Sequence, residues 1–164
     1  MKADGETQKV KVVFRFGPNA WHKHATESMW VTPMGESSFR LENVPFYARN
    51  VSFGDVVRAR RIRGLFVATS VAQRSGHSTY RIFSEQGESF DSSANWKRLE
   101  RLGCTYERAN KKLIAIDCPP KVDADRVYKV LKDGKSSGQW DFEEGHFSAP
   151  AEREKIAIEN PGWE

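Results

Sequence analysis

The chain has 164 residues, of which 38% are hydrophobic and 29% charged, and its formal net charge is +4. This length fits one domain or two very small ones, and an aromatic content of 12% can fill a buried core, which excludes wholesale disorder. No segment reaches the roughly 20 apolar residues of a membrane-spanning helix. The first residues contain no apolar signal-peptide core, so we expect a cytoplasmic protein with no membrane partner.

Residues 9–76 are expected to form an N-terminal β-rich half, a small curled sheet or barrel. Alternating apolar and polar residues from Val10 to Phe16 predict its first strand, and residues 28–32 and 38–41 predict a hairpin. The next segment, Glu42–Ser52, is a loop unusually rich in apolar side chains. Such a loop either plugs a core or lines a site.

Two more strands are expected before the end of this half. The first passes through Val56, Val57 and Ala59 and should end in a run of arginines, and Gly64 then turns the chain into a strand over residues 65–71. The arginines Arg58, Arg60, Arg61 and Arg63 predict a basic patch. The alternative interpretation is a strand edge protected by solvated charge.

Residues 77–148 are expected to form a ferredoxin-like α+β half with the element order strand, helix, strand, strand, helix, strand. Capping residues at 91–93 and Gly103 delimit the first helix, and Asp123 and Gly134 delimit the second. The two helices should cover one face of an antiparallel sheet. Residues 149–164 are predicted to be an acidic tail.

The segment Arg74–Arg81 concentrates two arginines, three hydroxyl residues, an imidazole and a glycine at the junction of the halves. Backbone amides near Gly76, with serine and arginine donors, could hold an anion. His77 could also act as an acid or base near neutral pH. The alternative is a tight polar turn whose hydroxyl groups satisfy the backbone.

Signatures of catalysis and of metal binding are missing from the sequence. There is no G-x-S-x-G elbow, no P-loop and no dinucleotide fingerprint. His22 and His24 could share a face of a strand, but no third ligand is near, so no metal site is predicted. Cys104 and Cys118 lack metal-ligand spacing, and we expect reduced thiols in or near strands. No cofactor is expected.

Three stretches together resemble a bacterial family known as domain of unknown function 4265: residues 27–31 with 43–48, residues 51–57, and residues 74–81. The likeness spans residues 10–147. It implies a bacterial cytoplasmic protein and supplies no activity. The family-like positions, which we expect to cluster, are Glu27, Trp30, Asn43, Phe46, Asp55, Ser75, His77 and Arg81. Arg74 and Ser78 complete this predicted polar junction, in which Asp55 would face an arginine or His77.

Three functions remain open at this point, and the sequence favours one without catalysis. The leading hypothesis is a protein that binds another protein, in its narrowest form an immunity protein that neutralises a bacterial toxin. The second is nucleic-acid binding through the basic strand from Arg58 to Arg63. The third is a small enzyme or ligand sensor built around His77. The partner, the ligand and the oligomeric state are not specified by the sequence.

Overall fold

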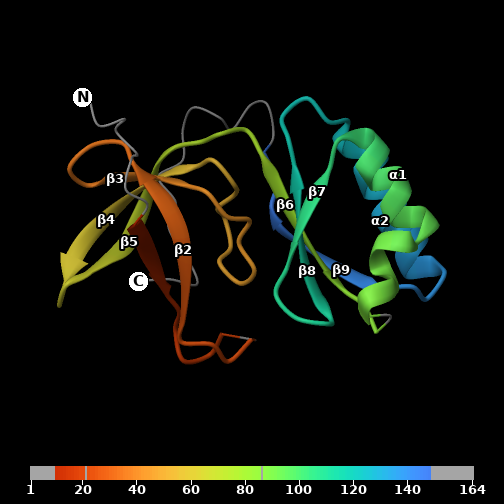
Figure 1. Cartoon of the computed structure of the whole chain (residues 1–164), viewed down its shortest axis with the longest axis horizontal. Helices are drawn as coiled ribbons and strands as arrows, with labels where there is room; N and C mark the ends of the chain where they lie inside the picture. The colour runs from red at the N-terminus through yellow and green to blue at the C-terminus, as the bar shows by residue number, and fades with distance from the viewer. Residues whose placement is uncertain (1–9, 21, 86, 149–164) are drawn as a thin grey trace, which may run out of the picture.

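The computed structural model describes residues 10–20, 22–85 and 87–148, so the predicted acidic tail lies outside the described residues. The chain is a mixed α+β protein with two β-structures. The N-terminal strands form a closed barrel in the order β1-β2-β3-β4-β5, and the C-terminal strands form a sheet in the order β7-β8-β6-β9. Figure 1 shows the barrel and the sheet side by side, with both helices on the far side of the sheet.

Alternation of buried and exposed side chains shapes the barrel. Its strands are β1 (Val10–Arg15), β2 (Thr26–Pro33), β3 (Ser38–Leu41), β4 (Val56–Ile62) and β5 (Leu65–Gln73). In β2, Met29 and Val31 point inward while Trp30 points outward. A parallel pairing of β1 with β5, at Val12 and Phe66, closes the barrel and leaves no free edge.

Strand β4 is longer than the sequence pattern indicates. The arginine run was expected to end it, but β4 continues to Ile62 because Arg58 and Arg60 alternate with the buried Val57 and Ala59. The strand then enters β5 through a two-residue turn in which Arg63 has φ 50° and Gly64 has φ 81°. Two consecutive positive φ angles are typical of the turn that matches the twist of a hairpin.

The C-terminal half combines four strands with two α-helices. Its elements are β6 (Ser78–Phe83), a 3₁₀ helix η1 (Gly87–Ser92), α1 (Ala94–Leu102), β7 (Thr105–Arg108), β8 (Leu113–Cys118), α2 (Ala124–Ser136) and β9 (Asp141–His146). Every pair of neighbouring strands in this sheet is antiparallel. Buried side chains of the two helices, including Leu99 and Val127, pack with Ile82, Ile114 and Ile116 in one core.

Helix boundaries follow the capping residues with one exception. The side chain of Ser93 accepts a hydrogen bond from the Trp96 amide, and Gly103, at φ 109°, ends α1. Gly134 was expected to end α2, but the helix runs on to Ser136. Gly134 is needed for packing instead, since a Cβ there would overlap the indole of Trp140.

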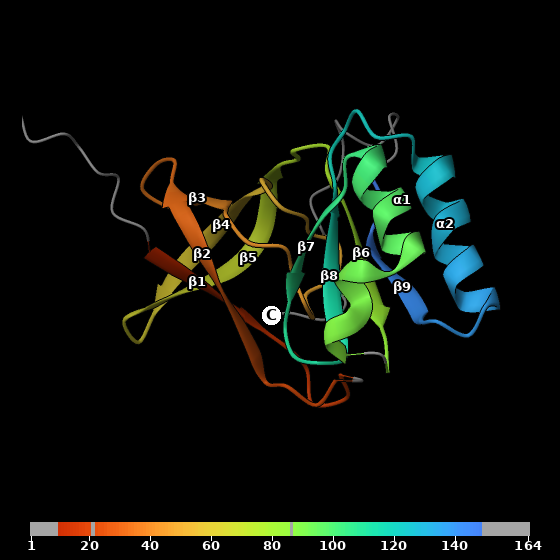
Figure 2. The same cartoon turned by 45° about the vertical axis from the view of Figure 1, so that its right-hand side comes forward.

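The second face of the C-terminal sheet lies against the barrel and its long β3–β4 loop (Figure 2). This face carries side chains that alternate with those of the helical core, among them Thr79 and Arg81 on β6 and Asp117 on β8. The two halves therefore meet over a face that is largely polar.

No described helix is both long and apolar enough to cross a membrane.

Candidate functional site at the junction of the halves

The β3–β4 loop fills the junction, and a buried carboxylate holds its backbone. Glu27, on β2, accepts hydrogen bonds from the amides of Phe46 (2.7 Å), Tyr47 (2.9 Å) and Ala48 (2.8 Å). Burial raises the pKa of Glu27, and the three amide donors oppose that shift. Two apolar residues of the loop, Ala48 and Val51, belong to the barrel core, so the loop plugs that core.

Arg81 joins the same loop to the sheet from the other side. Its side chain has no exposed surface, and its Nε donates to Glu143 on β9 at 2.6 Å. Its Nη1 donates to the carbonyl oxygens of Pro45 and Ala48. The Nη2 atom has no hydrogen-bond partner among the described residues. This fully buried arginine therefore connects β6 and β9 of the sheet to the β3–β4 loop of the N-terminal half.

Asp55 forms the second polar connection. The carboxylate is fully buried and pairs with Arg74 at 3.0 Å, and it accepts hydrogen bonds from the amides of Ser52 and Ser75. The Ser52 hydroxyl lies 2.7 Å from that of Thr79 on β6, which links the barrel side to the sheet. The expectation that Asp55 faces an arginine or His77 is confirmed, and the residue is Arg74.

His77 faces a carboxylate that the sequence analysis did not select. Its Nδ1 lies 2.8 Å from Asp117 Oδ1, and its ring lies beside that of Phe53, 5.4 Å between centroids. The Ser75 hydroxyl donates to the Phe53 carbonyl and accepts from the His77 amide. The Ser75 hydroxyl and the His77 ring therefore form hydrogen bonds with other groups of the protein, as the tight-turn interpretation predicts for this segment.

The remaining predicted junction residues lie at its margins. The Trp30 side chain is exposed, and its amide donates to Asn43 Oδ1 at 2.8 Å. Glu107, on β7, accepts from the Asn43 side chain and the Val44 amide. Ser78 points to the helical side of the sheet, where its hydroxyl accepts from the Ser148 amide. The structure thus brings most of the set together and places Trp30 and Ser78 outside it.

Three carboxylate partners of this network were missed, Glu107, Asp117 and Glu143, each on the second face of the sheet. Only Asp117 had a visible signal, as the single charged residue in the buried strand LIAIDC.

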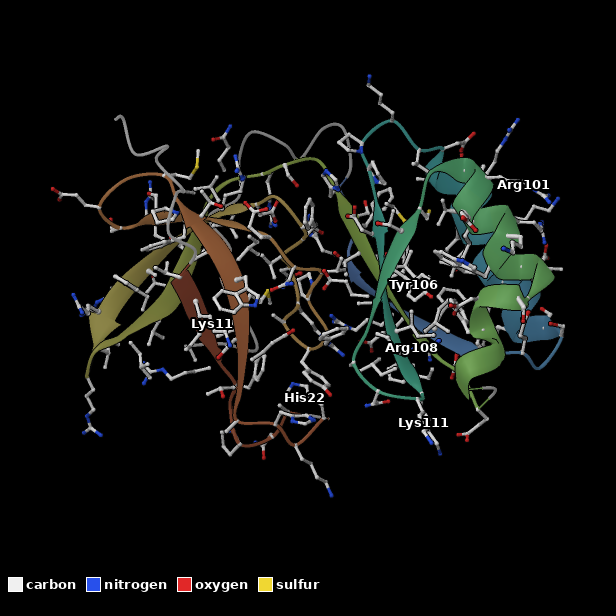
Figure 3. The ribbon with its side chains drawn as sticks, in the orientation of Figure 1. Lys11, His22, Arg101, Tyr106, Arg108 and Lys111 are labelled. Atoms are coloured by element: carbon white, nitrogen blue, oxygen red, sulfur yellow. The ribbon has the colours of Figure 1, made fainter. Side chains whose placement is uncertain are left out.

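The structure also places the histidine pair differently. His22 and His24 precede β2 in a loop (Figure 3 labels His22), with the His24 ring stacked on Tyr47. The described residues contain no group of three metal-ligating side chains.

The basic patch is carried by the β4–β5 hairpin, which points away from the C-terminal sheet (Figure 1). Arg58, Arg60, Arg61 and Arg63 are all exposed. The guanidinium group of Arg61 lies 5.5 Å from the centre of the Phe66 ring. None of the four arginines forms an ion pair with a residue that the structure describes. Leu65, next to this turn, is 56% exposed.

A barrel packed against a helix-covered sheet through a buried polar junction defines the chain as a two-part α+β protein. The family model for the domain of unknown function DUF4265 matches residues 27–142, and the chain belongs to this family. The fold is similar to a crystal structure of a hypothetical protein from Neisseria gonorrhoeae, with TM-score 0.72 and 17% identity. That likeness covers 87% of this chain and 96% of the other. No curated protein matches the chain.

Proposed function

We propose that the protein is a non-enzymatic binding protein whose β4–β5 hairpin contacts an acidic protein surface. The observation that carries this proposal is the set of four exposed arginines without described carboxylate partners, grouped around the exposed Leu65. Strand β4 contains three arginines and no acidic residue in VVRARRI. Arginine is enriched at protein interfaces, and an apolar side chain within a charged rim is the usual interface arrangement.

The junction supports this proposal by what its groups already do. Arg74 and Arg81 are paired with carboxylates, and the Ser75 hydroxyl donates to a backbone carbonyl. These donors are the ones that an anion or a substrate would use, so an enzyme or ligand sensor at His77 is the weaker hypothesis. The network's effect is to hold the barrel and the sheet as one rigid support for the hairpin.

The narrowest form of the proposal is an immunity protein that occludes an acidic surface of a toxin. It requires no chemistry of its own, only complementary charge and shape.

We further propose that the C-terminal half is a ferredoxin-like unit, because its element order and the sheet order β7-β8-β6-β9 follow that plan. A cytoplasmic location agrees with the two free thiols, Cys104 and Cys118.

Nucleic-acid binding is the second candidate, and one observation favours it. The ammonium group of Lys11 lies 4.6 Å from the centre of the Trp30 ring, and this exposed aromatic could stack on a base. Trp30 is on β2, however, and β3 separates it from the arginines of β4. The hairpin itself offers only Phe66, which is half-buried beneath Arg61. The arrangement therefore favours a protein partner.

Co-expression with the products of neighbouring genes tests the proposal. We expect one product to co-purify in stoichiometric amount after nuclease treatment, and the R58E/R60E/R61E variant to lose it. A matched control, K111E/K121E/K129E, changes the net charge equally at exposed positions of the C-terminal half and should retain the partner. If the product co-purifies without nuclease and is lost when nuclease is added, the association runs through nucleic acid, which would instead establish nucleic-acid binding. Retention by the arginine variant would refute the proposed surface, and a neighbouring product without toxicity would refute the immunity form.

A further inference from the structure

The two cysteines of the chain lie beside each other, Cys104 directly before β7 and Cys118 at the end of β8. Strands β7 and β8 pair with Thr105 opposite Asp117, and one further step of this register brings Cys104 opposite Cys118. The two sulfur atoms are 3.5 Å apart, and both side chains belong to the helical core. Directly opposed residues of antiparallel strands have Cα atoms about 4.5–5.5 Å apart, and disulfides need about 4.4–6.8 Å. The backbone is therefore already placed for a bridge.

Cys118 also borders a pocket, and Cys104 is not among the residues that line it. The pocket has a volume of about 230 Å³ and lies where β8 leads into α2. Its walls are mostly apolar or uncharged and include Tyr80, Pro119, Val127 and Phe147. Of the two cysteines, Cys118 is therefore the one that a small neutral molecule in this pocket would meet first.

We propose that Cys104 and Cys118 form a modification site, in which a small disulfide-bearing molecule enters the pocket and converts the pair into a reversible cross-strand disulfide. This inference is independent of the proposed binding function. No other cysteine exists in the chain to compete for either sulfur. In a reducing compartment such disulfides are usually transient and redox-sensing, which fits a reversible bridge.

The reaction proceeds in two exchange steps. Cys118 loses its proton, and its thiolate attacks one sulfur of the small disulfide, which forms a mixed disulfide and releases one small thiolate. The Cys104 thiolate then attacks the Cys118 sulfur, which forms the protein disulfide and releases the second small thiolate. The protein loses two protons and two electrons, and the small disulfide is reduced to two thiols. The sulfur atoms approach from 3.5 Å to a bond of about 2.05 Å by side-chain rotation.

The environment sets the pace of this reaction. The hydrogen bond with Cys104, followed by burial, raises the pKa of Cys118. Because only the thiolate attacks, the folded protein should react slowly at neutral pH and about tenfold faster for each pH unit above it. The pair should therefore react slowly with disulfides that it meets only by random collision. A molecule that binds in the pocket should react faster, because it stays next to Cys118 for longer.

The test treats the full chain with bis(2-hydroxyethyl) disulfide and follows the intact mass and the free thiols under native conditions. We expect the wild type to lose two hydrogens and both thiols without retaining an adduct. The C104S variant should keep one mercaptoethanol unit on Cys118, and C118S should stay unmodified. Peptide mapping of the treated wild type locates the bridge without any variant and covers the case in which a variant fails to fold.

Several results would overturn the inference. A stable adduct on Cys118 in the wild type would show that Cys104 cannot resolve it. Equal reaction of the C104S and C118S variants would remove the role of the pocket. Thiols that react only at urea concentrations that unfold the chain would show that the native pair is inert. Recovery of both thiols after treatment with dithiothreitol is expected if the bridge is reversible, and its failure would contradict that part.

Discussion

The guanidinium group of Arg81 lies directly over the backbone of Gly145, so closely that a Cβ at position 145 would be 3.1 Å from Arg81 Cζ. The absence of a side chain at position 145 of β9 thus creates the space in which the buried arginine reaches the loop carbonyls. The Asn50 amide donates to the Gly145 carbonyl at 3.0 Å, so the loop also contacts this strand directly. The missing side chain of Gly145 therefore makes room for Arg81, and its backbone carbonyl supplies a second connection to the loop.

Replacement of Gly145 by alanine tests this contact. The added methyl group must displace a guanidinium that Glu143 and two carbonyl groups hold in place, so G145A should lower the free energy of unfolding by about 1–3 kcal/mol. Urea denaturation measures the change. Gly35 is the matched control, because a Cβ there meets nothing within 4 Å, and G35A should be close to neutral. An equal effect of the two variants would contradict the packing described.

Glu27 should contribute to stability through its three amide donors. In E27Q the carboxylate becomes an amide that can no longer accept all three bonds, and a loss of about 2–3 kcal/mol is expected. Burial raises the pKa of Glu27 in the folded state above its pKa in the unfolded chain. Protonation of Glu27 therefore favours folding, and this contribution to stability is complete below the unfolded pKa and is lost as the pH rises through the folded pKa. Stability measured from pH 4 upward should therefore fall less steeply, or rise more, in E27Q than in the wild type. Parallel pH profiles would refute this.

His146 gives the opposite dependence on pH. Burial, followed by the charge of Arg74, lowers the pKa of His146 to about 4, while Asp55 acts against the shift. A depressed histidine pKa means that stability is complete above the unfolded value of about 6.5 and is lost as the pH falls toward 4. The loss should approach about 3 kcal/mol and should be absent in H146N. Urea denaturation at pH 7 and pH 4.5 compares the two proteins.

The contact between His77 and Asp117 can be measured by a double-mutant cycle. H77A and D117A should each destabilise the protein, and the double variant should lose less than the sum, with an interaction energy of about 1–3 kcal/mol. This outcome means that the pair holds the segment between the halves. A nearly unchanged melting temperature in H77A would contradict that role and would revive the hypothesis of an enzyme or sensor built around His77.

Much of the fold could be predicted from local patterns. Alternation along β1 and the caps at Ser93 and Asp123 place these elements correctly, because each depends on neighbouring residues alone. The end of β4 could not be located within its arginines, since exposed guanidinium groups fit either a strand face or a loop. Gly134 was wrongly expected to end a helix because its true role depends on Trp140, which packs on it from beyond the helix.

The candidate site was only half visible for a related reason. Asp55 and Arg74 are in segments of unusual composition, and they drew attention without any knowledge of their partners. Glu107 and Glu143 lie next to other charged residues in the short strands TYER and DFEEGH, so they look like ordinary solvent-facing charges. Their role depends on the barrel covering the second face of the sheet. That contact between distant parts of the chain leaves no local pattern.

Hydrogen–deuterium exchange with a bound partner tests the proposed binding surface most directly. The partner is the product that co-purifies with the wild type, and exchange is compared between the free and the bound chain. We predict that slowed exchange is concentrated in β4 and β5, around Arg58 to Leu65, with little change in α1 and α2. Protection confined to the helices or to the β3–β4 loop, with the hairpin unchanged, would contradict the assignment of the arginine-bearing hairpin as the contact.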